Sequence, residues 1–109
     1  MLFWLLIAAA QPLPDVSQPA VAGMMSSDDY PEEALRNDWQ GDVIVDLRIS
    51  AAGRVKSCRI HQSSGYPALD LKTCEIFLLR ARFTPAKDEQ GNPVEDNFRA
   101  PVVHWRLEE

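Results

Sequence analysis

The residues that could support catalysis gather around one short segment of the chain. Ser63 and Ser64 offer hydroxyl nucleophiles, with His61 and Asp70 nearby in the sequence as a base and an orienting acid. The spacing argues against such a triad, because His61 belongs to a strand that enters this loop and the sequence has no Gly-x-Ser-x-Gly elbow. The serines are better explained as loop and capping residues. We therefore predict no catalytic residue, no cofactor and a protein that is not an enzyme.

Two cysteines, Cys58 and Cys74, are the only thiols in the sequence. In a small exported domain such a pair predicts a disulfide, whereas in a cytosolic protein two buried free thiols are expected. A zinc site is a poor alternative, because the cysteines together with His61 and His104 lack the close spacing that presents ligands on one turn. We predict a disulfide, on condition that the protein is exported, and no metal site.

The N-terminal residues bear on export, because residues 1–10 are apolar and end in three alanines. As a helix this stretch would reach only ~14 Å, about half of the ~30 Å hydrocarbon core of a bilayer. Its length and its terminal alanines predict a secretory signal peptide that is cleaved after Ala10. Two alternatives stay open: an inner-membrane anchor if the true start lies upstream, and a buried first strand, which the prolines that follow disfavour.

Composition bounds the rest of the chain. Residues 11–29 hold three prolines and no hydrophobic period, which predicts a linker followed by one folded domain at residues 30–109. With 46% hydrophobic and 25% charged residues among 109, the chain is neither a disordered protein nor a multi-span membrane protein. The net charge of −5 leaves no basic excess for phosphates, so we expect no nucleic-acid partner.

The elements that position these residues begin with a short helix that opens around Asp29–Leu35 and stops at Gly41. In residues 42–50 a strict period of two places Val43, Val45, Leu47 and Ile49 on one face, with Asp42, Asp46 and Arg48 opposite, which predicts a half-buried strand. A turn containing Gly53 leads into a second strand at residues 55–62, and the two form a hairpin. The apolar positions of the second strand step by three from Val55 to Cys58, which predicts a bulge there.

A second helix is predicted from Leu69 to Arg82, and its helical period assigns a buried stripe and a far side. The residues of the predicted stripe are Leu71, Cys74, Phe77, Leu78 and Ala81. Ile76 and Leu79 fall on the far side, as exposed residues or as a partner face.

The chain closes with a strand predicted over residues 94–107. Pro101 cannot donate to a ladder, which places this strand at a sheet edge or gives it a bulge. The element order is α-β-β-α-β. The predicted fold class is α+β, with a three-stranded antiparallel sheet and two helices on one face.

Several short motifs, read in order, resemble the TonB C-terminal domain family over residues 30–107. They are Tyr30-Pro31-x-x-Ala34, Gly41-x-Val43-x-Val45, Gly53-x-Val55, Ser63-Ser64-Gly65, Leu69-Asp70, Phe83-x-Pro85-Ala86 and Gly91-x-Pro93-Val94. The resemblance implies a periplasmic domain that docks on outer-membrane TonB-dependent receptors and pairs a strand with the receptor's TonB-box peptide. It also implies a partner in the inner membrane, a proton-driven motor.

The resemblance and the edge position of the last strand together give the candidate binding residues. The predicted peptide-binding residues are Asn97, Phe98, Arg99, Ala100, Val102, Val103 and His104. Tyr30 and Pro31 are carried over as supporting residues. The apolar start and the Pro-rich spacer are much shorter than those of the family's energy transducers, so a second hypothesis stays open. In it the chain is a stand-alone envelope domain whose edge strand pairs with itself in a homodimer, without a motor.

Overall fold

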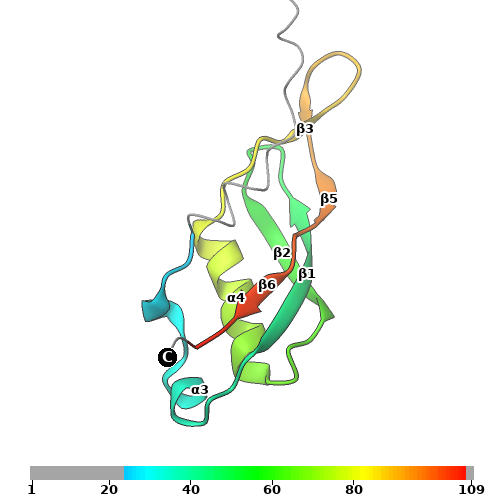
Figure 1. The fold of residues 1–109 in the computed structure, drawn as a ribbon. Coiled ribbons are helices and arrows are strands. Elements are labelled where there is room, and N and C mark those ends of the chain that lie inside the picture. The colour runs from blue at the N-terminus through cyan, green and yellow to red at the C-terminus, as the bar shows by residue number, and fades with distance from the viewer. Residues whose placement is uncertain (1–23, 108–109) are drawn as a thin grey trace, which may run out of the picture.

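The computed structural model describes residues 24–107 of the chain (Figure 1). The predicted signal peptide and most of the predicted linker lie outside the described residues. The elements are, in order, the 3-10 helix η2 (Ser27–Asp29), α3 (Glu32–Arg36), β1 (Gly41–Ile49), β2 (Val55–Gln62), α4 (Pro67–Arg80), β3 (Ala86–Lys87), β4 (Pro93–Val94), β5 (Asp96–Arg99) and β6 (Val103–Trp105). The α+β prediction is confirmed.

The main sheet is antiparallel and is built around β1. One side of β1 pairs with β2, and the other side pairs first with β6 and then with β5. The sheet therefore has four strands, not the predicted three, because the last strand is divided where Pro101 falls. Proline has no N–H to give to a ladder, so pairing stops before it and resumes at Val103.

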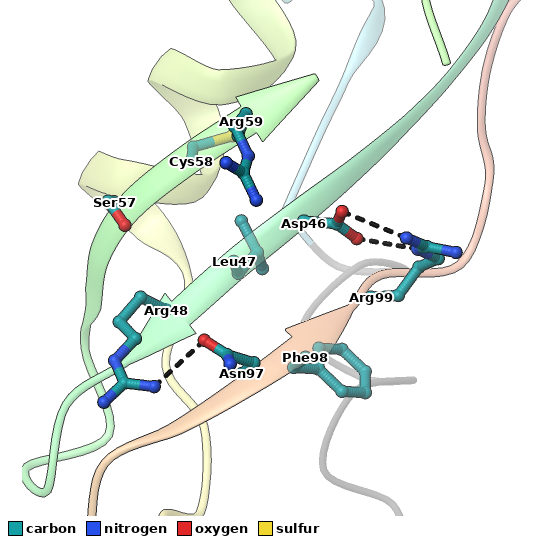
Figure 2. Close-up of a pocket in the computed structure, with 9 residues that line it drawn as sticks. All are labelled: Asp46, Leu47, Arg48, Ser57, Cys58, Arg59, Asn97, Phe98 and Arg99. Carbon is teal, nitrogen blue, oxygen red and sulfur yellow. Dashed lines mark hydrogen bonds and ion pairs between the residues drawn. The ribbon is translucent and has the colours of Figure 1, made fainter. Parts of the chain in front are cut away.

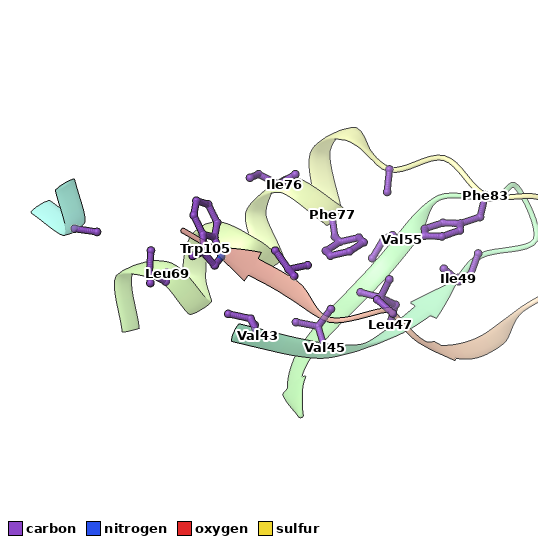
Figure 3. Packing of buried hydrophobic residues seen from close by; sticks show 14 residues of the cluster. Val43, Val45, Leu47, Ile49, Val55, Leu69, Ile76, Phe77, Phe83 and Trp105 are labelled. Carbon is purple, nitrogen blue, oxygen red and sulfur yellow. The ribbon is translucent and has the colours of Figure 1, made fainter. Parts of the chain in front are cut away.

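The alternation of β1 determines which face of the sheet is buried. Val43, Val45, Leu47 and Ile49 are all at most 5% exposed, and they form the centre of the core (Figure 3). Phe77 of α4 packs in the same cluster, as do Val103 and Trp105 of β6. The polar residues between them face the other side, as period-two alternation requires. The predicted strand is thus confirmed over almost its whole length.

The predicted hairpin and bulge are also present. Gly53 has φ +85°, and a Cβ at this position would lie 2.1 Å from the Phe83 carbonyl oxygen, so the turn needs glycine. Arg48 lies opposite Ser57 while Ile49 lies opposite Val55, so the extra residue of the bulge is Lys56.

Helix α4 covers one face of the sheet. Its predicted buried stripe is confirmed in part: Phe77 and Ala81 are buried and Cys74 packs against the core, whereas Leu71 and Leu78 are exposed. Leu69, Thr73, Ile76 and Phe77 are the buried residues of α4. Ile76 is 1% exposed, whereas Leu71 is 72% exposed and Leu78 is 37% exposed. The prediction was wrong for Leu71, Leu78 and Ile76 because apolar residues occur nearly all round this helix, and because Thr73 was not counted. The Thr73 hydroxyl donates to the Leu69 carbonyl and accepts from Trp105 Nε1, each at 2.8 Å, so its burial leaves no polar atom unsatisfied.

A disulfide joins Cys58 of β2 to Cys74 of α4, with the two Cα atoms 5.6 Å apart. The pairing is the one predicted from the sequence. It fastens the helix to the outer strand of the hairpin and closes a separation of 16 residues.

The segment before Tyr30 contacts the domain, although the sequence places it in the linker. Met24 and Met25 pack against the core, and the Asp29 side chain is only 9% exposed. Arg80, the last residue of α4, donates two hydrogen bonds to Asp29, at 2.8 and 2.9 Å. These bonds lower the pKa of Asp29 to about 2. The ion pair therefore holds the segment against the end of α4.

Helix α3 is shorter than predicted, since it ends at Arg36 rather than close to Gly41. The polar loop after α4 carries the small hairpin β3–β4, which turns at Gly91 with φ +85°. Between residues 24 and 107, no helix has the length and the apolar character needed to cross a membrane.

Candidate functional site

One edge of the sheet is formed by β5 and β6, and the opposite edge is formed by β2. Within residues 24–107 both strands pair only with β1, which leaves the opposite side of each without a neighbouring strand. The predicted peptide-binding stretch therefore lies along a free sheet edge.

The direction of the backbone groups follows from one hydrogen bond. The Ala100 N–H donates to the Val45 carbonyl at 3.0 Å, so Ala100 and, by alternation, Phe98 point their backbone groups at β1. The backbone groups of Asn97 and Arg99 then point outward. The Asn97 N–H donates to the Asp96 carboxylate at 2.8 Å. On β5, Arg99 is therefore the residue whose outward N–H can bind a partner.

The same alternation applies to β6. Val43 and Gly41 share the orientation of Val45 along β1 and lie opposite Val103 and Trp105. The backbone groups of His104 between them consequently point outward. The free edge thus has two stretches, one at Arg99 and one at His104.

The seven predicted peptide-binding residues fall into two groups. Phe98, Ala100 and Val103 serve the core: Ala100 and Val103 are buried, and the Phe98 ring lies 5.7 Å from that of Phe83. Val102 is half-buried in the break between β5 and β6. Asn97, Arg99 and His104 are exposed and lie on the open face of the sheet. The stretch therefore combines packing residues with three side chains that a partner can reach.

Charged pairs cross the open face beside this edge. Arg99 donates to both oxygens of Asp46, at 2.7 and 3.1 Å, and this lowers the pKa of Asp46 (Figure 2). His104 Nδ1 lies 2.8 Å from Asp42, and this hydrogen bond, with a second from Arg106, lowers the pKa of that carboxyl group. The outward side chains of the edge are thus held over β1 by its aspartates.

The open face also forms a shallow hollow of about 630 Å³. Figure 2 shows Arg48 reaching toward Asn97 and Arg59 lying over the middle of the sheet. This hollow lies across β2, β1 and β5, and its lining mixes charged and polar groups, two pairs of which bind each other, with Leu47, Cys58 and Phe98.

A second hollow, of about 500 Å³, lies beside β6. Its lining residues come from the N-terminal segment, from α3 and from the end of the chain: Met25, Ser26, Ser27, Tyr30, Leu35, His104, Trp105, Arg106 and Leu107. The Tyr30 ring meets that of Trp105 edge to face at 5.2 Å, and its hydroxyl donates to the Trp39 carbonyl. Tyr30, one of the two supporting residues, therefore lies next to β6, and Pro31 immediately precedes α3.

Sequence reasoning missed most of this second hollow. Met25 and Ser27 belong to a stretch whose prolines and lack of period indicated a linker, and Leu35 is a single exposed leucine on a short helix. The sequence did contain one signal that could have found this segment. Ser26 and Asp29 form a capping box, which marks the start of a helix at Ser27, three residues before the expected domain.

The residues that suggested catalysis do not form a triad. Ser63 and Ser64 both donate from their hydroxyls to Asp70, in the first turn of α4. They lie in the loop as predicted, but the N-cap residue of α4 is Tyr66, which makes no side-chain capping hydrogen bond. His61 lies 3.9 Å from Asp46 instead. No cluster of three or more metal-ligating side chains is found in the part of the chain that the structure describes.

The fold and the edge define a small α+β domain whose sheet ends in a free, interrupted strand. The chain belongs to the family described as the Gram-negative bacterial TonB protein C-terminal, whose model matches residues 26–106. It is also 31% identical over 79 residues to "Protein tonB2" of Pseudomonas aeruginosa. That match covers 72% of this chain and 28% of the relative, so the chain spans less than a third of the relative's length. No solved structure matches the chain significantly.

Proposed function

We propose that the domain binds the TonB-box peptide of an outer-membrane receptor by strand addition to the β5–β6 edge, as part of energy-coupled transport across the outer membrane. The observation that carries the proposal is the free edge in a member of the TonB C-terminal family. An extended peptide gains main-chain hydrogen bonds at such an edge, and its alternate side chains supply specificity. The role is binding rather than catalysis.

The outward backbone groups of Arg99 and His104 are the proposed hydrogen-bonding partners of the peptide. Pro101 separates them and offers no N–H, so the added strand is held in two short stretches rather than along one continuous ladder. The guanidinium of Arg99 and the imidazole of His104 lie on the open face beside the added strand, where they favour a peptide that carries acidic or polar residues on that face.

The compartment is proposed to be the periplasm, reached by the signal peptide at residues 1–10. The Cys58–Cys74 disulfide supports an oxidising compartment. Coupling to an inner-membrane proton-driven motor is proposed from the family alone.

The test is a titration of the domain with a synthetic TonB-box peptide, followed by amide chemical shifts. The amides of Arg99 and His104 should move, whereas those of β2 should stay. Replacing His104 by proline removes one outward N–H. Peptide affinity should then fall about tenfold, which is the loss expected when one main-chain hydrogen bond to the peptide is missing. His104→Ala keeps that N–H and is the matched control. Shifts confined to the β1–β2 hairpin, or equal binding by the two variants, would refute the assignment.

A second candidate function rests on the same free edge. In a homodimer the β5–β6 edges of two copies would pair with each other. Sedimentation with and without the peptide separates the two, because a dimer that uses this edge dissociates when peptide is added.

A further inference from the structure

The hollow beside β6 is more apolar than the hollow on the open face. Its apolar lining comes from Met25, Tyr30, Leu35, Trp105 and Leu107, and its polar lining comes from Ser26, Ser27, His104 and Arg106. The Leu35 side chain, on the five-residue helix α3, is 47% exposed, so a large apolar surface faces water. An apolar side chain that entered the hollow would cover this surface.

The hollow is built before any ligand arrives. Its N-terminal wall is fixed by the bidentate pair between Asp29 and Arg80, and Arg80 also donates to the Met24 carbonyl at 3.1 Å. Tyr30 is fixed at its hydroxyl by the Trp39 carbonyl and at its ring by Trp105. A site whose walls are already ordered loses little entropy on binding, which favours a defined occupant.

The geometry of strand addition selects which side chain would enter. Residues directly opposite each other on neighbouring strands point to the same face of the sheet. His104 points to the open face, and Trp105 points to the face where the hollow lies. A peptide residue that faces the side of Trp105 is therefore aimed at the hollow, and its two neighbours are aimed at the open face.

We propose that this hollow is a side-chain subsite that receives one apolar residue of the strand added to β6. The inference rests on the proposed function and deepens it by naming the chemistry of one peptide position. The selected peptide has an apolar residue in the hollow, flanked by polar or acidic residues that face His104 and Arg106 across the edge.

The experiment is a double-mutant cycle between the wall of the hollow and the peptide. Ser27 is exposed and lines the hollow, so Ser27→Trp places an indole inside it without touching the edge backbone. The probe is a synthetic TonB-box peptide, together with variants in which each apolar residue is replaced in turn by alanine. Ser57→Trp, an exposed serine on β2, is the matched control for the bulk of the new side chain.

With the wild-type domain, one alanine variant should bind about tenfold more weakly, the loss expected when one large apolar side chain is no longer buried. Ser27→Trp should weaken the parent peptide by a similar factor, yet bind that alanine variant as well as the wild-type domain does, because the two changes remove the same contact. Ser57→Trp should change neither.

The subsite is overturned if the effects of Ser27→Trp and of the alanine replacement on affinity are additive, or if Ser27→Trp leaves binding of the parent peptide unchanged. In either case the proposed function still stands, provided that the amide shifts of Arg99 and His104 move with the peptide. If no peptide binds the wild-type domain, the proposed function fails and the subsite fails with it. Leu35→Glu gives a second route, since a carboxylate at the mouth of the hollow should weaken the parent peptide but not its alanine variant.

Discussion

Reducing the Cys58–Cys74 bond is expected to destabilise the domain by an amount that follows from its position. The bond closes a separation of 16 residues, and a cross-link of that span lowers the conformational entropy of the unfolded chain by the equivalent of about 3 kcal/mol. A domain of this size has a total stability of only about 5 kcal/mol, so the bond supplies more than half of it. The reduced domain should remain folded at 25 °C, but only narrowly.

Reduction is the perturbation that changes least, because it breaks the S–S bond and removes no heavy atom. Oxidised and reduced wild-type protein differ only in the cross-link, whereas the pair Cys58→Ala and Cys74→Ala also removes two partly buried sulfur atoms from the core. The reduced protein should therefore unfold before the oxidised protein, and the alanine pair should unfold earliest of the three.

Urea unfolding followed by far-UV circular dichroism measures the difference. With a slope of about 1 kcal/mol per molar urea, the reduced protein should reach its midpoint about 3 M lower. In a thermal scan the same loss corresponds to a decrease of about 12–24 °C in Tm. Mass spectrometry after alkylation confirms which sample carries the bond. Equal midpoints in samples that differ in this bond would refute the loop-entropy argument, and two free thiols in unreduced periplasmic protein would refute the bond itself.

Three further predictions concern residues that the structure places in specific contacts. Gly53→Ala should destabilise by at least about 2 kcal/mol in urea titration, since the turn needs a positive φ and the new Cβ would meet a carbonyl oxygen; an unchanged midpoint would contradict this. Ile76→Ala should lower the free energy of unfolding by about 3 kcal/mol and Leu79→Ala by less than about 0.5 kcal/mol, because the two side chains are 1% and 62% exposed. A larger loss for Leu79→Ala than for Ile76→Ala would mean that α4 buries the opposite side. Asp29→Asn should lower the free energy of unfolding by about 1–2 kcal/mol at neutral pH, since water screens the ion pair at its half-exposed partner Arg80. The native pKa of Asp29 lies below its ordinary value of 3.8, so the stability it supplies is complete above about pH 4 and is lost as the pH falls toward 2. Wild type should therefore lose more stability than the asparagine variant over that interval, and parallel pH profiles would contradict the assignment.

Much of the fold could be read from the sequence because its signals are local. The period-two spacing of Val43, Val45, Leu47 and Ile49 determines both the strand and its buried face, since a shift of one residue would expose all four of these side chains. Gly53 marks the turn for a similar reason, as few other residues adopt its backbone angles. The bulge at Lys56 was visible as a break in the period, and the α+β class follows from the order of these elements.

The candidate site could be read only in part. Pro101 and the family resemblance together predicted a last strand that lies at a sheet edge or carries a bulge, with the binding stretch at residues 97–104. They could not show that β5 and β6 both return to β1, because that pairing depends on how the chain passes the break at Pro101. Nor could they show the hollow beside β6, whose walls come from residues 25–35 and 104–107, two stretches that are far apart in sequence.

The orientation of α4 and the place of residues 24–29 were decided by tertiary structure alone. Apolar residues surround α4, so its periodicity is compatible with more than one buried side, and contact with the sheet and with Trp105 selects the side that holds Thr73 and Ile76. Residues 24–29 have almost no apolar period. They are held by the ion pair between the buried Asp29 carboxylate and the half-exposed Arg80, which lies 51 positions further along the chain. Local pattern reports how a segment prefers to fold, whereas burial and ion pairing depend on partners that only the completed fold brings together.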